Sequence, residues 1–166
     1  MKKYIKEATI LALIVLVVTN IIGFYKASSI KAKSSFNILL EQKSIGGTNL
    51  KTLLLKNKPL VLNFWGSWCP VCNQEISTIN KIAKDKSTIL VTVAVNSGED
   101  KDIKAFMQSK NANFLVINDN SGAIAKSFNI TTYPTTIFYS PNREKTIKDS
   151  GYLSYMGYLA RKKIVE

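Results

Sequence analysis

Histidine is absent from this sequence of 166 residues, and cysteine occurs only twice. Without histidine the chain cannot supply a Ser-His-Asp or Cys-His catalytic pair, or histidine ligands for zinc or haem. Two cysteines are too few for a disulfide-rich scaffold or for the four thiolates of a closed zinc or iron–sulfur site. We therefore expect no cofactor and no metal, and the chemistry that remains is that of one cysteine pair.

Acidic residues are scarce, with 11 Asp and Glu against 23 Lys and Arg, for a net charge of +12. Beyond residue 33 the chain holds 17 basic and 10 acidic residues, a net of +7, scattered along its length. No basic stripe with interleaved aromatic residues appears, which disfavours nucleic acid as a partner. A solvated basic surface is the expectation, and contact with anionic lipid is the alternative.

The N-terminal segment contains the longest stretch without charge, residues 8–25. A helix of this length spans about 27 Å, close to the ~30 Å hydrocarbon core of a bilayer. Residues 1–25 are therefore predicted to be a membrane anchor, followed by a basic linker at residues 26–35. A cleaved signal peptide is the alternative. Three lysines lie on each side of the apolar stretch, so the positive-inside rule gives no orientation.

Strand-like and helix-like segments alternate after residue 36. The apolar runs Leu60–Trp65 and Ile89–Val95 predict strands buried on both faces. Further strands are expected at residues 114–117, 135–139 and 146–151. Helices are expected after residue 70, at residues 100–110, at residues 121–128 with Ser121 as N-cap, and in a last segment containing Tyr155, Tyr158 and Leu159. This alternation predicts an α/β fold with helices on both faces of a sheet.

The cysteines lie in the segment Trp-Gly-Ser-Trp-Cys-Pro-Val-Cys, residues 65–72, directly after a predicted strand and before a predicted helix. At a helix N-terminus the free N–H groups and the dipole favour thiolate over thiol. Pro70 is tolerated there because its missing N–H is not needed in the first turn. We expect Cys69 to be the exposed nucleophile and Cys72 to be the shielded thiol that resolves a mixed disulfide.

Other uses of a cysteine pair are less well supported. A zinc knuckle would need two further Cys or His ligands. Covalent haem attachment would need His after Cys72, where this chain has Asn73. Two buried inert cysteines, or a two-thiolate copper(I) site, remain as alternatives.

These residues resemble a known family. The features that carry the resemblance are the segment Lys58–Cys69, Glu75, the strand at residues 91–95, the turn at residues 118–122, the Tyr-Pro-Thr-Thr segment at residues 133–136, and Gly151. The chain is similar to the TlpA/ResA/CcmG group of membrane-anchored bacterial thiol–disulfide oxidoreductases. The resemblance implies a thioredoxin-like domain at residues 36–166, with a central mixed β-sheet flanked by helices. It also implies that the domain lies on the extracytoplasmic (periplasmic) side of a bacterial membrane.

The resemblance also implies roles for individual residues. Pro134 matches the cis-proline that packs against the cysteine pair. Glu75 matches a glutamate that accepts the proton of the resolving thiol, and the alternative is an acid placed to interact with the helix dipole. Asn63 stands where cytosolic thioredoxins have a buried Asp, so proton handling would fall to Glu75.

Four residues around the cysteine pair are expected to contact substrate: Trp68, Pro70, Tyr133 and Thr135. Trp65 is expected to pack in the core. The bulky Tyr133 directly before the proline departs from the family pattern, so the resemblance does not carry substrate preference over to this chain.

The expected function is a membrane-tethered reductase of disulfides in exported proteins, similar to those of cytochrome c maturation. Its partners would be protein disulfides and a membrane protein that donates electrons through a dithiol, and we expect a monomer. A Pro-Val dipeptide between the cysteines lacks the His that stabilises the thiolate in strong oxidants, which favours a reductant. One alternative is an oxidase or exchange protein in metal-stress defence. The other is a copper(I)- or peptide-binding tether without catalysis.

Overall fold

A computed structural model of the protein describes Ile14 and residues 36–166. Except for Ile14, the predicted anchor at residues 1–25 and the linker at residues 26–35 lie outside the described residues. Ile38–Glu166 form one compact unit. In this described part of the chain, no helix combines the length and the apolar character needed to cross a membrane.

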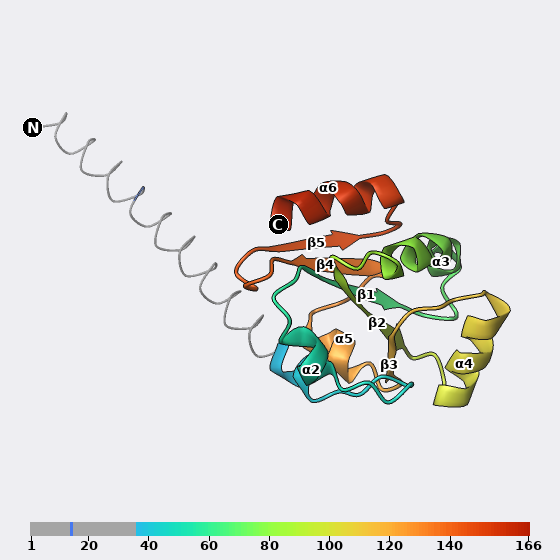
Figure 1. The fold of residues 1–166 in the computed structure, drawn as a ribbon. Helices are drawn as coiled ribbons and strands as arrows, with labels where there is room; N and C mark the ends of the chain where they lie inside the picture. Colours follow the sequence, from blue (N-terminus) through green and yellow to red (C-terminus); the bar gives the residue numbers. More distant parts are fainter. Residues whose placement is uncertain (1–13, 15–35) are drawn as a thin grey trace, which may run out of the picture. The chain divides into compact units, whose positions relative to one another are not determined.

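The core of the unit is a five-stranded sheet in the order β3-β2-β1-β4-β5 (Figure 1). β1 pairs in parallel with β2, and β2 with β3, whereas β4 and β5 are antiparallel to their neighbours. The sheet is therefore mixed, as expected. The strands are β1 (Leu60–Trp65), β2 (Ile89–Val95), β3 (Val116–Asp119), β4 (Thr135–Tyr139) and β5 (Thr146–Ser150).

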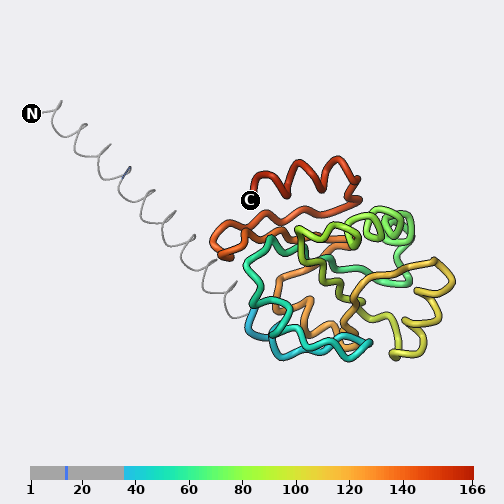
Figure 2. Tube along the Cα trace, in the orientation of Figure 1, coloured from blue at the N-terminus to red at the C-terminus, as the bar shows by residue number. Residues whose placement is uncertain are grey.

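Helices cover both faces of the sheet, which confirms the predicted α/β architecture. They are α2 (Leu50–Leu54), α3 (Pro70–Ala83), α4 (Asp100–Ser109), α5 (Ala123–Ser127) and α6 (Tyr155–Val165). α3 and α6 pack on one face, where Ile79 and Tyr158 join a cluster with Val61 of β1. Phe64 points to the other face and contacts Phe128, which ends α5, at 5.4 Å between ring centroids. Figure 2 shows the same arrangement as a trace, with α6 on one side of the sheet and α2 and α5 on the other.

The central strand is fully buried because it has a neighbour on each edge and helices on each face. All six residues of β1 are buried, whereas β5 alternates between exposed and half-buried residues, as an edge strand does. Side chains that alternate along β1 therefore point to different helices. Asn63 and Val61 point toward α3 and α6, and Phe64 points away from them.

The start of α5 differs from the prediction. Gly122, with φ of 72°, is the N-cap, and the expectation that Ser121 caps this helix is wrong. Asp119 takes over the capping role, because its carboxylate accepts hydrogen bonds from the backbone N–H groups of Ile124 (3.0 Å) and Ala125 (2.8 Å). The helix starts two residues later than expected, since a glycine at positive φ turns the chain first.

The C-terminal helix is fastened to the loop after α3 by Asp85. One oxygen of this carboxylate accepts hydrogen bonds from the Tyr158 hydroxyl (2.6 Å) and the Lys162 ammonium (2.8 Å). The other accepts from the backbone and hydroxyl of Ser87, at 2.9 and 2.6 Å. α6 is thus held by apolar packing along one side, by the Asp85 carboxylate, and by the ion pair of Arg161 with Asp149 of β5 at 2.8 Å.

Candidate functional site

The cysteine pair lies where β1 ends and α3 begins. Cys69 and Cys72 form a disulfide with 5.2 Å between their Cα atoms. Cys69 is the N-cap of α3, and Pro70 occupies the first turn, where its missing N–H has no cost. The backbone N–H of Cys72 donates to Cys69 Sγ at 3.2 Å. After reduction, the same N–H and the helix dipole would stabilise a Cys69 thiolate.

Both cysteines are buried in this disulfide state, with 4% of Cys69 and 3% of Cys72 exposed. The expectation of an exposed Cys69 is therefore wrong for the oxidised protein. The reason is packing: the two cysteines belong to a cluster with Trp65 of β1 and Ile103 of α4. In addition, the backbone oxygen of Tyr133 lies 3.7 Å from Cys69 Sγ, which has no proton to donate in a disulfide. These neighbours therefore shield the sulfur of Cys69 from solvent in the disulfide form.

The Tyr133–Pro134 peptide bond is cis, as the resemblance implied. The Pro134 carbonyl accepts a hydrogen bond from the Gly151 N–H at 2.8 Å, so this carbonyl is used within the fold. Thr135 is fully buried, and its hydroxyl donates to the Thr132 carbonyl at 2.8 Å and lies 3.0 Å from the Ser150 hydroxyl. This placement corrects the expectation that the Thr135 side chain contacts substrate: it holds the turn before β4 in shape.

Trp68 forms an exposed wall beside the disulfide. Its side chain is 54% exposed, yet the ring is fixed because Nε1 donates to the Val95 carbonyl at 3.1 Å. The Tyr133 ring meets it edge to face at 5.4 Å between centroids. Gly66 allows this position, since a Cβ there would lie 2.5 Å from the indole. Pro70 is also exposed, so Trp68, Pro70 and Tyr133 can all be reached by a substrate chain.

Glu75 lies inside the protein, three residues after Cys72 and on the same side of α3, since residues i and i+3 of a helix are neighbours. Only 1% of it is exposed. Oε1 accepts from the Leu153 N–H at 2.6 Å, and Oε2 accepts from Asn63 Nδ2 at 3.1 Å. No acid stands in the first turn of α3, so the helix-dipole alternative has no support from its position.

The surroundings of Glu75 bring its pKa into the neutral range. Burial raises the pKa from 4.5 to about 7, against the lowering effect of the hydrogen bonds from Leu153 and Asn63. The negative charge of Asp149 adds a smaller rise. A carboxyl with this pKa can both accept and release a proton near pH 7.

Four chain segments near the disulfide carry no charged residue. They are residues 66–74, 95–98, 131–136 and 151–154. They expose Trp68, Val71 and Tyr152, of which 54%, 40% and 51% are accessible. The mouth of the site, defined as these four segments, is therefore uncharged and partly aromatic in a protein of net charge +12.

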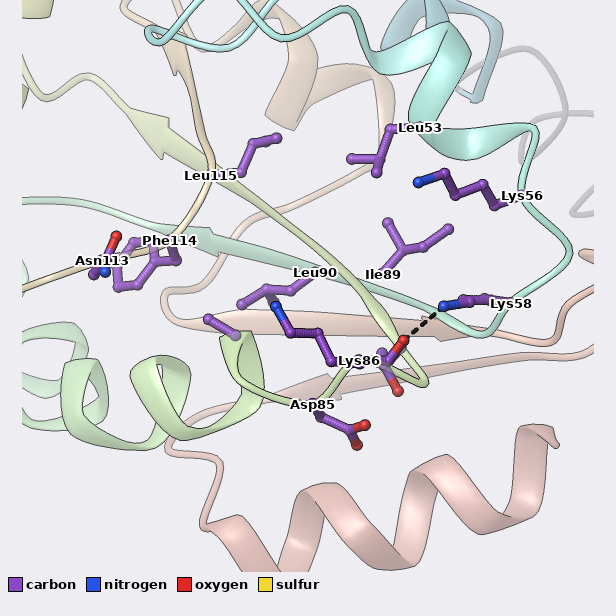
Figure 3. Close-up of a pocket in the computed structure, with 12 residues that line it drawn as sticks. Leu53, Lys56, Lys58, Asp85, Lys86, Ile89, Leu90, Asn113, Phe114 and Leu115 are labelled. Atoms are coloured by element: carbon purple, nitrogen blue, oxygen red, sulfur yellow. Dashed lines mark hydrogen bonds between the residues drawn. The ribbon is translucent and has the colours of Figure 1, made fainter.

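The cleft of Figure 3 lies elsewhere, beside the residues where β2 begins. It has a volume of about 470 Å³, and Lys56, Lys58 and Lys86 are among its lining residues. Lys58 Nζ donates to the Lys86 carbonyl at 2.7 Å, as the dashed line shows. Cys69 follows the other end of β1, so this basic cleft is separate from the mouth. Across the described residues, no group of His, Cys, Asp and Glu is arranged to hold a metal ion.

Comparison with known proteins supports the chemistry of the cysteine pair. The model of the AhpC/TSA family matches residues 27–148. The chain belongs to the AhpC/TSA family. Within it, the chain is 30% identical to a thioredoxin-like protein of Haemophilus influenzae over 160 residues, covering 96% of this chain and 93% of the relative. It is 33% identical to the thiol-disulfide oxidoreductase ResA of Bacillus subtilis over 118 residues, covering 70% of this chain and 65% of ResA.

The solved structures extend this agreement to the fold. A secreted disulfide oxidoreductase of Mycobacterium tuberculosis, described as homologous to E. coli DsbE, has 24% identity and a TM-score of 0.63. The likeness covers 74% of this chain and 93% of that structure, and it confirms the thioredoxin-like fold. The similarity to the TlpA/ResA/CcmG group is confirmed, and this AhpC/TSA family member is a thiol–disulfide oxidoreductase.

Sequence reasoning missed two parts of the site. The Leu153 N–H that binds Glu75 is a backbone group, so no residue type marks it. Tyr152 is placed beside Pro134 and Glu75 because its two neighbours, Gly151 and Leu153, bind these residues. The only signal in the sequence was Gly151, which is part of the family pattern.

Proposed function

We propose that the protein is a membrane-tethered reductase of disulfides in exported proteins, acting on the extracytoplasmic side of a bacterial membrane. The observation that carries this proposal is the Cys69–Cys72 disulfide at the start of α3, with the buried Glu75 on the same side of the helix. The uncharged residues 8–25 support the tether, since they match the length of a membrane helix. The resemblance to the TlpA/ResA/CcmG group supports apocytochrome c as a substrate class.

The reaction starts from the reduced protein and proceeds by two exchanges. The Cys69 thiolate attacks one sulfur of the substrate disulfide, and the other substrate sulfur leaves as a thiolate. Cys72 then gives its thiol proton to Glu75 and attacks Cys69 Sγ, which closes the Cys69–Cys72 disulfide. The second substrate sulfur leaves in its turn, and the protons lost by Cys69 and Cys72 end on the two substrate thiols. The substrate gains two electrons and the protein loses two.

The mouth of the site supplies the docking surface in this mechanism. Trp68 and Tyr133 form a wall on one side of the sulfur of Cys69, with Pro70 exposed at the start of α3. An extended substrate segment would lie along this edge and bring its disulfide to Cys69. Regeneration needs two electrons from a membrane protein with a dithiol, since this chain offers only sulfur as a redox centre.

Trapping with a cysteine variant tests the exchange step. In Cys72→Ser the mixed disulfide cannot be resolved, so the full-length protein should accumulate covalent adducts with disulfide proteins on a non-reducing gel. Cys69→Ser is the matched control and should form none, because the nucleophile is absent. If both variants give equal adducts, Cys69 is not the nucleophile. If neither gives any, the protein is not an exchange enzyme.

The direction of electron flow is tested by the reduction potential of the full-length protein. A reductase should have a potential near or below about −270 mV, the value of thioredoxin. A potential near about −120 mV would mean a strongly stabilised thiolate and would replace the reductase with an oxidase.

A further inference from the structure

Asn63 occupies the middle of the central strand and points into the protein beside Glu75. It is 1% exposed, and its register partner in β4 is Thr136, which is also 1% exposed. A polar side chain at this depth is stable only when hydrogen-bonded. Asn63 meets this condition through two neighbours on two different elements.

Both hydrogens of the Asn63 amide are used. Nδ2 donates to Glu75 Oε2 at 3.1 Å and to Thr136 Oγ1 at 2.9 Å. An amide nitrogen carries two N–H donors, so this nitrogen has none left. Thr136 therefore fixes the plane of the amide, and the amide in turn fixes the position of Oε2.

The hydrogen bonds around Glu75 fit its carboxylate form. Each of its oxygens faces a donor: Oε1 faces the Leu153 N–H and Oε2 faces Asn63. A protonated Glu75 carries an O–H that needs an acceptor, and neither donor provides one. The Leu153 N–H belongs to the backbone and cannot change direction, whereas the Asn63 amide can.

Rotation of the Asn63 amide group about its Cβ–Cγ bond can exchange the positions of Oδ1 and Nδ2, so that Oδ1 lies where Nδ2 lay. Oδ1 is an acceptor with two lone pairs, so it could accept from the Glu75 O–H and from the Thr136 hydroxyl at once. The two hydrogen bonds that join the three side chains would then be kept with their directions reversed. Neither Asp nor Leu at position 63 could serve both forms: Asp would place a second carboxylate against Glu75, and Leu would bind neither form.

We propose that Asn63 is a positioning residue for the proton transfer at Glu75: supported by Thr136, its amide donates to the carboxylate and, after reversing, accepts from the carboxylic acid. This inference rests on the proposed role of Glu75 as the proton acceptor of Cys72. Asn63 thus keeps Glu75 in one place through the catalytic cycle, and it limits how far burial raises the pKa of that carboxyl.

Other ionisable groups near Glu75 are few. Asp149 of β5 raises its pKa slightly, and its own charge is paired with Arg161 of α6 at 2.8 Å. Cys72 of α3 is the group from which the proton comes. None of these groups is bonded to Asn63, so replacing Asn63 changes the Glu75 network without removing a charge.

The test is the pH dependence of mixed-disulfide resolution in the full-length protein, together with the titration of the Glu75 carboxyl by carbon NMR. In Asn63→Leu the carboxylate loses a charge-assisted hydrogen bond, whereas the carboxylic acid loses only a weaker neutral one, so both midpoints should move up by about one pH unit or more. Well above the new midpoint the resolution rate should return to the wild-type value. Thr136→Val should cause a smaller shift in the same direction, because Asn63 remains but is less well held.

Thr92→Val is the matched control. Thr92 is the register partner of Asn63 in β2 and is equally buried, but its hydroxyl donates to the Leu115 carbonyl at 2.9 Å. This variant should leave both midpoints unchanged. Equal midpoints in Asn63→Leu and Thr92→Val would overturn the proposal, and so would a loss of rate in Asn63→Leu that is the same at every pH.

The two proposals fail in different ways. If Asn63→Leu shifts the carboxyl titration but resolution in wild type and Glu75→Gln is the same at every pH, Glu75 is not the proton acceptor. The proposed catalytic role of Asn63 then falls with it, although the contact between the two side chains stands. If instead Glu75→Gln slows resolution and Asn63→Leu does not shift it, only the role of Asn63 is wrong.

Discussion

At the scale of single residues, burial gives the Glu75 carboxyl a pKa at which it can gain or lose a proton near pH 7. Its environment is apolar enough to raise the pKa to about 7, and two hydrogen bonds stop the rise there. A carboxyl left without donors at this depth would stay protonated at neutral pH and could not take the proton-accepting role proposed for Glu75.

Glu75 should also make the stability of the protein depend on pH. Its pKa in the folded protein is about 7 against 4.5 for an ordinary Glu, so the folded state holds a proton in this window that the unfolded state has lost. The free energy of unfolding should therefore fall as the pH rises from about 4.5 to about 7, by at most about 3 kcal/mol from this group. Thermal unfolding of the wild type and of Glu75→Gln across this range measures the effect.

The difference between the two proteins is what matters in this experiment. The side chain of Gln does not ionise, so the melting temperature of Glu75→Gln should change less with pH than that of the wild type. Parallel curves for the two proteins would mean that Glu75 titrates alike in the folded and unfolded states.

Residue types and spacing were sufficient to find the chemical groups but not their surroundings. Cys69 and Cys72 could be selected from the sequence because their spacing and context place them at the start of one helix, and Glu75 was selected through the resemblance. The burial of Cys69 could not, since it depends on Tyr133, which is distant in sequence. Nor could the Leu153 N–H, because every residue except proline has one.

At the scale of elements, Asp85 in the loop that follows α3 binds two residues of α6. Burial alone would raise the pKa of Asp85, but hydrogen bonds from Lys162, Ser87 and Tyr158 outweigh it and hold the pKa well below its usual range. The side chains of Asp85 and Lys162 are 19% and 15% exposed, so solvent screens this pair only in part. The carboxylate thus contributes stability above the ordinary pKa of Asp, and that contribution is lost in acid.

Asp85→Asn should therefore weaken the docking of α6. At neutral pH we expect the free energy of unfolding to fall by about 2 kcal/mol, because a charged acceptor of several hydrogen bonds is replaced by a neutral amide. Urea unfolding measures the change. Glu41→Gln is the control, since Glu41 is exposed and should have almost no effect. Equal stability of the two variants would mean that the hydrogen bonds of Asp85 add nothing to the docking of α6.

The elements themselves could be predicted to different degrees. β1 and β2 were found at their observed bounds because long apolar runs mark strands buried on both faces. α2 was missed because its five residues span too few turns to show a period, whereas α5, which is equally short, was found together with a candidate cap, Ser121. The start of α5 was misplaced because its cap is formed by Asp119, at the end of β3.

At the scale of the whole molecule, the uncharged mouth contrasts with the net charge of +12. The lysines of the cleft in Figure 3 lie away from the disulfide, beside the start of β2. Electrostatic attraction of a substrate to the mouth would have to come from groups outside these four segments, whose fields are screened at physiological salt.

Exchange with an uncharged substrate should accordingly depend little on ionic strength. With 2-hydroxyethyl disulfide, we expect the rate to change by less than about twofold between about 20 mM and about 500 mM salt. Stopped-flow kinetics of the reduced full-length protein provides the measurement. A steep fall with salt would show that charges outside the mouth take part in the reaction. A peptide disulfide carrying acidic residues is the useful comparison. Its exchange rate should fall as salt is added, because salt screens its attraction to the basic surface.

The chain contains two tryptophans, and both lie at the disulfide: Trp65 packs with the two cysteines, and Trp68 precedes Cys69 directly. Disulfide sulfur quenches nearby indole emission by electron transfer, whereas the emission of tyrosine is weaker and occurs at shorter wavelength. The intrinsic fluorescence of the protein therefore comes mainly from two indoles that lie beside the reacting sulfurs. The intact chain, without any label, has an optical signal that reports whether its own cysteines are joined.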